Sequence, residues 1–170
     1  MAYHPENGVK SLLHNNWYNR LMQLNYWAPR VTVAAIIPRE EKFLLVEENI
    51  NGKTVVNQPA GHLENNESLL DAVVRETLEE TRWDFQPSYI SGIYRWKHDN
   101  GDTYMRFCFV GEVIVEHKEK SLDTGIQRTA WLSEKEIREH KNLRSPLVLK
   151  SIEDYINGNK YPLSLIQDIN

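Results

Sequence analysis

The alternation of hydrophobic and polar positions predicts strands in the first part of the chain. The run VTVAAII, which begins at Val31, is typical of a buried strand, and KFLLVEE follows it after a PREE turn. The pair Asn51 and Gly52 is a hairpin signal that leads into KTVVNQP. These segments therefore predict a β-rich beginning to the folded domain.

A helix and further strands are predicted downstream. Helical spacing extends from Ser68 to Thr81, and two strands follow, around Tyr89–Trp96 and Thr103–Val115, joined by the turn HDNGD. The segment RTAWL predicts a short strand that runs into Ser133, a good N-cap with a glutamate three positions later.

The last helix is predicted to begin at Ser145 and Pro146, with the serine as its cap, and to end near Gly158. The order of elements is sheet, helix, sheet and two helices. It predicts an α+β domain in which a mixed β-sheet lies between α-helices, an α/β/α layered arrangement.

The sequence predicts one folded domain, over residues 26–170, preceded by an N-terminal extension over residues 1–25. Apolar residues recur in this extension at three- and four-residue spacing, namely at Leu13, Trp17, Leu21 and Leu24. This spacing predicts a short amphipathic helix, which could pack on the domain or on a second subunit. We therefore expect a monomer or a homodimer.

Composition narrows the class of protein. A chain of 170 residues with a net charge of −4 suits a single domain that does not itself attract nucleic acid or anionic lipid. Cys108 is the single cysteine, so no internal disulfide forms, and no apolar run approaches the roughly 20 residues of a membrane span. The N-terminal sequence also lacks the apolar stretch of a signal peptide. We expect a cytoplasmic protein without membrane or nucleic-acid partners.

The predicted helix separates apolar from charged residues. One arc, which should face a core, holds Leu70, Val73, Val74, Thr77 and Leu78, and the opposite arc holds Arg75, Glu76, Glu79 and Glu80. The three carboxylates project from neighbouring turns and repel one another. A solvated charged face is the plainer interpretation. The alternative is a magnesium site, because Mg²⁺ binds carboxylate oxygens and bridges to substrate phosphates.

The approach to this helix supports the magnesium interpretation. Pro59, Ala60 and Gly61 come directly out of a predicted strand, and glycine lets backbone pass close to a metal or a phosphate. The carbonyl of Ala60 is then a candidate ligand. An ordinary turn would explain these three residues equally well if they stood alone.

At these residues the sequence resembles the Nudix hydrolase family. The Nudix box, over residues 61–83, has six fixed identities in register: Gly61, Glu67, Arg75, Glu76, Glu79 and Glu80. Two positions depart from it. Thr77 stands where an apolar residue is usual, and Arg82 stands where glycine is usual, which implies a different helix exit or mild strain.

The resemblance extends to the NudJ-type subfamily of bacterial Nudix phosphatases, through NQPAGHLE at residues 57–64, NLRSPLV at residues 142–148 and the ending YINGNKYPLSLIQDIN. It implies a Nudix fold and hydrolysis of nucleoside tri- and diphosphates, and of hydroxymethylpyrimidine diphosphate, with Mg²⁺ or with Mn²⁺ in its place. The partner is then a small nucleotide or diphosphate. Alternatives on the same scaffold are an ADP-ribose hydrolase, an enzyme of RNA 5′ ends and a non-catalytic nucleotide sensor.

The box register assigns metal binding to Glu76, Glu79, Glu80 and the Ala60 carbonyl. Arg75 would orient Glu79, so that the catalytic set is Arg75, Glu76 and Glu79. Glu67 lies near the helix start, and we expect it to support the loop or to act as an outer ligand. The general base is one of the helix glutamates or a carboxylate from a later segment, for which Asp123 and Glu112 are candidates.

Substrate contacts are predicted from aromatic and basic residues on the two later strands. Arg95 and Arg106 suit phosphate, and the neighbouring rings can stack on a base, although an ordinary amphipathic strand explains the same pattern. His62, directly after Gly61, is a candidate for phosphate contact or for loop packing. We expect Cys108 to be a small buried residue rather than a nucleophile.

Overall fold

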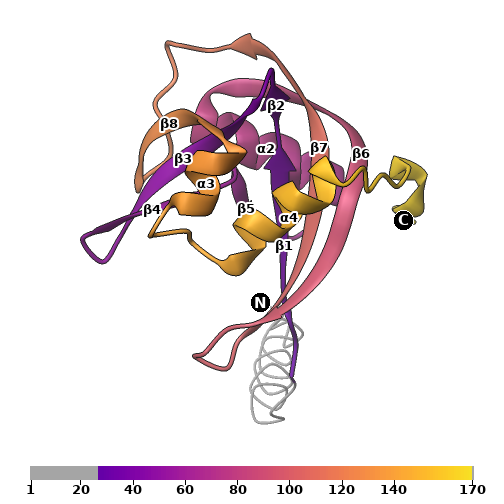
Figure 1. Ribbon diagram of the computed structural model, residues 1–170. Coiled ribbons are helices and arrows are strands. Elements are labelled where there is room, and N and C mark those ends of the chain that lie inside the picture. The colour runs from indigo at the N-terminus through magenta and orange to yellow at the C-terminus, as the bar shows by residue number, and fades with distance from the viewer. Residues whose placement is uncertain (1–26, 170) are drawn as a thin grey trace, which may run out of the picture.

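The structure is a computed structural model that describes residues 27–169, so the predicted helix in the N-terminal extension lies outside the described residues (Figure 1). The elements follow in the order β1 (Arg30–Ile36), β2 (Pro38–Arg39), β3 (Lys42–Ile50), β4 (Lys53–Asn57), β5 (Ala60–His62), α2 (Leu69–Thr81), β6 (Trp83–Lys97), β7 (Thr103–Glu116), β8 (Ile126–Ser133), α3 (Glu134–Glu139), α4 (Pro146–Ile156) and the 3-10 helix η1 (Leu163–Leu165). None of the helices in this part of the chain is long and apolar enough to span a membrane.

The strands form two sheets. The first has the order β5-β1-β7-β6, and it is mixed because β1 and β7 are parallel whereas its other pairs are antiparallel. In the second, β2, β4 and β8 all pair antiparallel with β3. The predicted hairpin at Asn51 and Gly52 is confirmed, since both residues have positive φ and Ile50 pairs with Lys53 across a two-residue turn.

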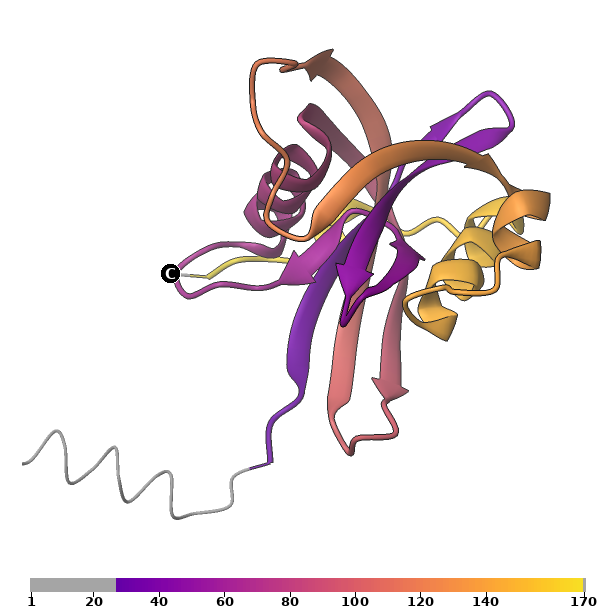
Figure 2. The same cartoon turned by 90° about the vertical axis from the view of Figure 1, so that its left-hand side faces the viewer.

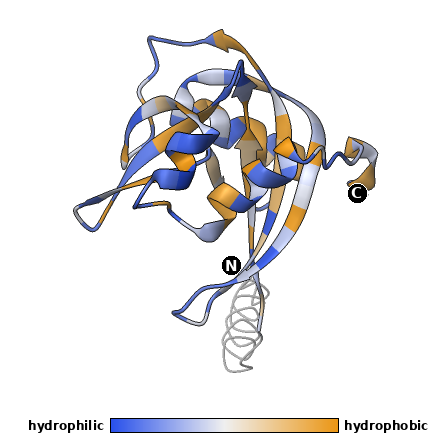
Figure 3. Cartoon of the chain, in the orientation of Figure 1, coloured by the Kyte–Doolittle hydropathy of each residue, from blue (hydrophilic) through white to orange (hydrophobic). Residues whose placement is uncertain are grey.

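Helices cover both sides of the strands, with α2 on one side and α3 and α4 on the other (Figure 2). Two core clusters result. Ala34 and Ile36 of β1 pack with residues of α3 and α4, whereas Val33 and Ala35 pack with residues of α2. Because successive side chains of a strand point to opposite faces, β1 is buried on both faces. This explains its unbroken apolar run, and Figure 3 shows how apolar and polar positions recur along the other elements.

Helix α2 begins where it was predicted. Ser68 is the N-cap and forms a capping box with Asp71. Thr77 is fully buried and its hydroxyl donates to the Val73 carbonyl at 2.8 Å, so a polar residue fits the apolar face without an unpaired group. The helix ends at Arg82, which is left-handed with φ 66°.

Three predictions about element boundaries need correction. Strand β6 begins at Trp83, immediately after the helix, rather than near Tyr89. The bend after Pro59 is the short edge strand β5, which pairs with β1. Ser145 occupies the N-cap position of α4, but its hydroxyl makes no capping bond and is instead buried without a hydrogen-bond partner within residues 27–169.

Candidate active site

Arg75 is the centre of a salt-bridge network on α2. Its Nε and Nη2 donate to the Glu67 carboxylate at 3.0 and 2.8 Å, and its Nη1 donates to Glu76 at 2.8 Å and to Glu79 at 3.1 Å. Glu67 also accepts from the Glu64 amide at 2.6 Å, which ties the preceding loop to the helix. These hydrogen bonds, chiefly that from Arg75, hold the pKa of Glu67 below its usual range.

Strand β5 directs backbone groups at this network. The Ala35 amide donates to the Pro59 carbonyl at 2.9 Å. In this register Gly61, which lies opposite Val33, is the next residue whose backbone amide and carbonyl face β1. In an antiparallel pair the intervening residue turns its own amide and carbonyl outward. Ala60 is that residue, and its carbonyl therefore lies on the outward edge of β5.

Carboxylates of α2 meet this outward edge. The Ala60 amide donates to Oε2 of Glu80 at 2.8 Å, and the His62 carbonyl accepts from Nη2 of Arg75 at 3.1 Å. A Cβ at Gly61 would overlap the Glu76 carboxylate, so a larger residue here would displace that carboxylate from its position. The structure therefore brings the box glycine, the Ala60 backbone and two box glutamates together.

Burial and mutual repulsion favour a cation here. Glu80 is 7% exposed, and burial, together with the charges of Glu48, Glu76 and Asp123, raises its pKa to about 9 despite the bond from Ala60. Burial likewise raises the pKa of Glu76, against the opposing effect of Arg75. Carboxylates in such surroundings are stabilised by a bound cation. The donor set, hard oxygens beside a glycine, fits Mg²⁺.

The side chains do not converge fully as they stand. Among residues 27–169, no three acidic, histidine or cysteine side chains are already placed to share one ion. The bonds from Arg75 draw Glu76 and Glu79 toward the guanidinium, whereas Glu80 is turned toward Ala60. Shared ligation by the three glutamates therefore requires side-chain rotation, and it stays a prediction.

The two candidate bases from later segments differ in position. The Asp123 amide donates to the Glu79 carbonyl at 2.9 Å, and the Asp123 charge contributes to the raised pKa of Glu76 and Glu80. Asp123 therefore lies at the site. Glu112 is exposed on β7 opposite Gln86, and among the described residues no side-chain hydrogen bond or salt bridge joins it to the box.

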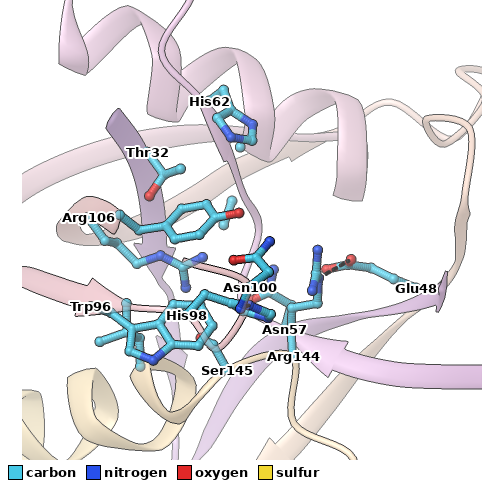
Figure 4. A pocket seen from close by; sticks show the side chains of 14 residues that line it. Thr32, Glu48, Asn57, His62, Trp96, His98, Asn100, Arg106, Arg144 and Ser145 are labelled. Atoms are coloured by element: carbon cyan, nitrogen blue, oxygen red, sulfur yellow. Dashed lines mark hydrogen bonds and ion pairs between the residues drawn. The ribbon is translucent and has the colours of Figure 1, made fainter. Parts of the chain in front are cut away.

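A cavity of about 380 Å³ opens beside β5. Figure 4 shows side chains from separate elements pointing into it. The lining residues are Thr32, Glu48, Asn57, Ala60, Gly61, His62, Trp96, His98, Asn100, Tyr104, Arg106, Arg144, Ser145 and Leu147. Because Ala60 and Gly61 belong both to this wall and to the carboxylate site, the cavity continues the box.

Unused hydrogen-bonding capacity is concentrated around this cavity. In the described part of the chain, eight buried side-chain atoms lack a partner, and six of them belong to lining residues: Oγ1 of Thr32, Oε1 of Glu48, Oδ1 of Asn57, Nε and Nη1 of Arg106, and Oγ of Ser145. An unpaired buried polar atom costs about 1–3 kcal/mol. A polar ligand that pairs with these atoms explains why they are retained.

The cavity is also positively charged near β5. Arg106 is 8% exposed, and burial lowers its pKa. Burial and the charges of Arg30, Arg106 and Arg144 lower the pKa of His62. A buried guanidinium beside a carboxylate site is suited to a phosphate group.

The predicted substrate residues divide between the two faces of the strands. Arg106 and His62 line the cavity, whereas Arg95 is exposed and absent from its wall. Arg95 pairs with Met105, and Trp96 with Tyr104, so adjacent β6 residues face opposite sides. The alternation thus separates Arg95 from the cavity. Cys108 is fully buried, and burial raises its pKa to about 11, as expected of a packing residue.

Several lining residues were not predicted from the sequence as site residues, among them Glu48, Asn57, Arg144 and Ser145. Glu48 and Asn57 are polar residues that follow the apolar runs of β3 and β4, which is a usable signal. Arg144 and Ser145 lie just before α4, and only the fold brings them to the cavity.

Comparison with known proteins adds independent findings. A NUDIX domain model matches residues 28–150. The chain is 44% identical over 142 residues to phosphatase NudJ of Escherichia coli strain K12, across 84% of this chain and 93% of that protein. A solved NUDIX hydrolase from Nitrosomonas europaea superposes with a TM-score of 0.81 at 49% identity, across 84% of this chain and 98% of that one. A MutT protein from Methanosarcina mazei Go1, at 24% identity and a TM-score of 0.65, shares the fold.

Proposed function

Because this chain belongs to the Nudix hydrolase family, which hydrolyses phosphoric anhydride bonds, we propose that its substrates are nucleoside tri- and diphosphates and hydroxymethylpyrimidine diphosphate. The observation that carries the proposal is the junction at β5. There the repelling carboxylates of α2 adjoin a cavity that holds the buried guanidinium of Arg106, two of whose nitrogens lack a partner among the described residues. A substrate that joins a diphosphate to a polar ring matches both parts.

We propose Mg²⁺ as the cofactor, with Mn²⁺ able to replace it. Glu76, Glu79, Glu80 and the Ala60 carbonyl would hold the ion, because these are the hard oxygen donors that meet at the outward edge of β5. When bound, the ion would neutralise phosphate charge and lower the pKa of the attacking water.

The side chains divide the remaining work. Arg75 positions Glu76 and Glu79 through its Nη1, and Glu67 holds Arg75 in place. Glu79, the exposed member of the three box glutamates, is assigned as the proton acceptor. Arg106 and His62 would bind phosphate oxygens from the cavity side.

One assay tests the activity. The protein is incubated with nucleoside tri- and diphosphates, ADP-ribose and hydroxymethylpyrimidine diphosphate, with Mg²⁺ or with EDTA. Orthophosphate and pyrophosphate are measured separately, which shows the bond that is cut. We expect metal-dependent release from the nucleotides and the pyrimidine diphosphate. Binding of a nucleotide without release of phosphate would indicate a nucleotide sensor and contradict the proposal. Preferred release from ADP-ribose would indicate an ADP-ribose hydrolase instead.

Two variants test the residues. Glu79→Gln and Glu80→Gln should each lower kcat at least about 100-fold while preserving the fold, because they remove charge that the transition state needs. Glu112→Gln is the matched control, since it removes an exposed carboxylate from β7. Near-normal turnover by either box variant would refute the assignment.

The cytoplasmic location and the monomeric or homodimeric state also remain proposals. Mass measurement in solution, with and without residues 1–21, tests the second of these. A dimer that the truncation dissociates would place the extension in the subunit interface.

A further inference from the structure

Two buried acceptor oxygens on the cavity wall have no donor. Oε1 of Glu48 and Oδ1 of Asn57 lack a hydrogen-bond partner among the described residues. The Glu48 side chain is 13% exposed, and Asn57 is 4% exposed. Oxygens held in this way favour a ligand that brings N–H or O–H groups.

The sheet places these two residues on one face. Val46 of β3 pairs with Asn57 of β4, and Glu48 pairs with Val55. Glu48 and Asn57 are therefore diagonal neighbours, whose side chains emerge on the same side of the sheet. Two acceptors so placed can each take one hydrogen from a single –NH₂ group.

A salt bridge contributes to the orientation of Glu48. Its other carboxylate oxygen, Oε2, lies 3.5 Å from Nε of Arg144, as the dashed line in Figure 4 marks. Arg144 thus occupies one oxygen and leaves the other without a partner. A carboxylate in this position accepts hydrogen bonds and cannot donate them while it is ionised.

The opposite wall is aromatic. The rings of Trp96 and Tyr104 are stacked with their centroids 5.5 Å apart and 29° between their planes, and His98 lies edge-on to Trp96. All three residues line the cavity. Such rings provide faces on which a planar heterocycle can stack.

We propose that the cavity selects substrates whose heterocycle carries an exocyclic amine, and that Glu48 and Asn57 recognise this amine. Cytosine and adenine present two N–H donors at this position, whereas uracil and hypoxanthine present a carbonyl oxygen. A carbonyl would face two acceptors and leave all of them unpaired. The proposal rests on the proposed function, since it names the substrate class of the same site.

A phosphate group does not explain these oxygens. Its oxygens are acceptors, and the charge of Glu48 would repel them. The donors of Arg106 serve that group instead. The acceptors and the donors of the cavity would thus take different groups of one substrate.

The first test is binding, measured by calorimetry in EDTA with CMP and UMP. These nucleotides differ in the pyrimidine only by an amine and ring nitrogen in place of a carbonyl and ring N–H. We expect CMP to bind roughly 5- to 150-fold more tightly, the range for one well-formed base contact. Equal affinities, or no binding of either nucleotide at millimolar concentration, would overturn the proposal.

The second test uses variants of adjacent glutamates. A glutamine at position 48 can present either its oxygen or its –NH₂, so Glu48→Gln should bring the CMP-to-UMP preference, and the CTP-to-UTP ratio of kcat/KM, to within about 3-fold of unity. Glu47→Gln is the matched control, because Glu47 bonds to Arg128 instead of facing the cavity. It should keep the wild-type preference.

The outcomes separate this proposal from the hydrolase proposal. A preference for CMP without hydrolysis of any nucleotide would support amine recognition and contradict the hydrolase assignment. Hydrolysis of CTP and UTP at equal kcat/KM would support the hydrolase assignment and contradict amine recognition. If Glu48→Gln lowers kcat/KM for both nucleotides by the same factor, Glu48 supports the box and does not recognise the base, which also overturns the proposal.

Discussion

Gly61 is the residue at which the backbone and the box carboxylates approach most closely. Gly61→Ala should lower kcat at least about 100-fold, because the new Cβ would occupy the position of the Glu76 carboxylate and displace it. Steady-state kinetics measures the loss, and circular dichroism checks the fold. Gly52→Ala is a useful comparison, since nothing lies within 4 Å of a Cβ there, and it should affect stability but not kcat. Normal turnover by Gly61→Ala would contradict the crowding argument.

Glu80 makes stability depend on pH. Its pKa rises from 4.5 to about 9 on folding, so the folded state keeps a proton that the unfolded state loses. The stabilisation that this proton provides is complete below pH 4.5, the pKa in the unfolded state, and it is lost as the pH rises through about 9, the pKa in the folded state. In EDTA, wild type should therefore lose stability relative to Glu80→Gln between about pH 5 and 9, by at least about 1 kcal/mol at the upper end. Urea unfolding at several pH values measures this, and a difference that is constant with pH would contradict it.

At the residue scale, the sequence predicted the box better than the cavity. Gly61, Glu67, Arg75 and Glu76 lie in one continuous segment, the last two on α2 and the first two shortly before it, so their fixed register could be recognised in the sequence. Glu48 and Arg144 are distant in the chain, and only the pairing of β3 and the position of α4 bring them to one wall. A single sequence carries no signal for that proximity.

At the scale of elements, the exit from α2 is a local point of strain. Arg82 adopts the left-handed conformation that glycine adopts without a Cβ penalty, and its contact with Glu116 is long, at 3.9 Å. Arg82→Gly should stabilise the protein by roughly 0.5–1 kcal/mol, the relief of strain less the entropy that glycine loses.

Thermal unfolding measures the effect of Arg82→Gly, and kcat/KM should stay unchanged because Arg82 does not line the cavity. Arg82→Ala keeps the Cβ and should give no such gain. A destabilised glycine variant would show that the contacts of the Arg82 side chain outweigh the strain.

Elements with local signals were predicted well. The capping box at Ser133 and Glu136 is confirmed, and so is the left-handed Gly158 after α4. Strand β5 was missed because three residues are too short for a periodicity. The division into two sheets was also missed, since the pairing of β3 with β8 joins segments that no local pattern connects.

At the scale of the whole molecule, metal binding should appear as stability. An ion that binds only the folded state at 100 times its Kd adds about 2.7 kcal/mol, or roughly 5–11 °C in Tm for a domain of this size. Mg²⁺ should therefore raise the Tm at pH 8, and EDTA should reverse the rise. Glu80→Gln should respond less. An unchanged Tm at saturating Mg²⁺ would contradict the proposed ion site.

The cavity takes most of its walls from β1, β3, β4, the β6–β7 hairpin and the start of α4, and it shares only β5 with the box, which β5, α2 and the loop between them carry as one uninterrupted stretch. Apart from β5, the two parts of the site are thus encoded in separate stretches of the gene. Exchanging the tip of the β6–β7 hairpin, or the residues just before α4, would change the leaving group that the cavity accepts without altering the residues of the Nudix box. The same separation makes the hairpin and the start of α4 the places to diversify in a directed-evolution library.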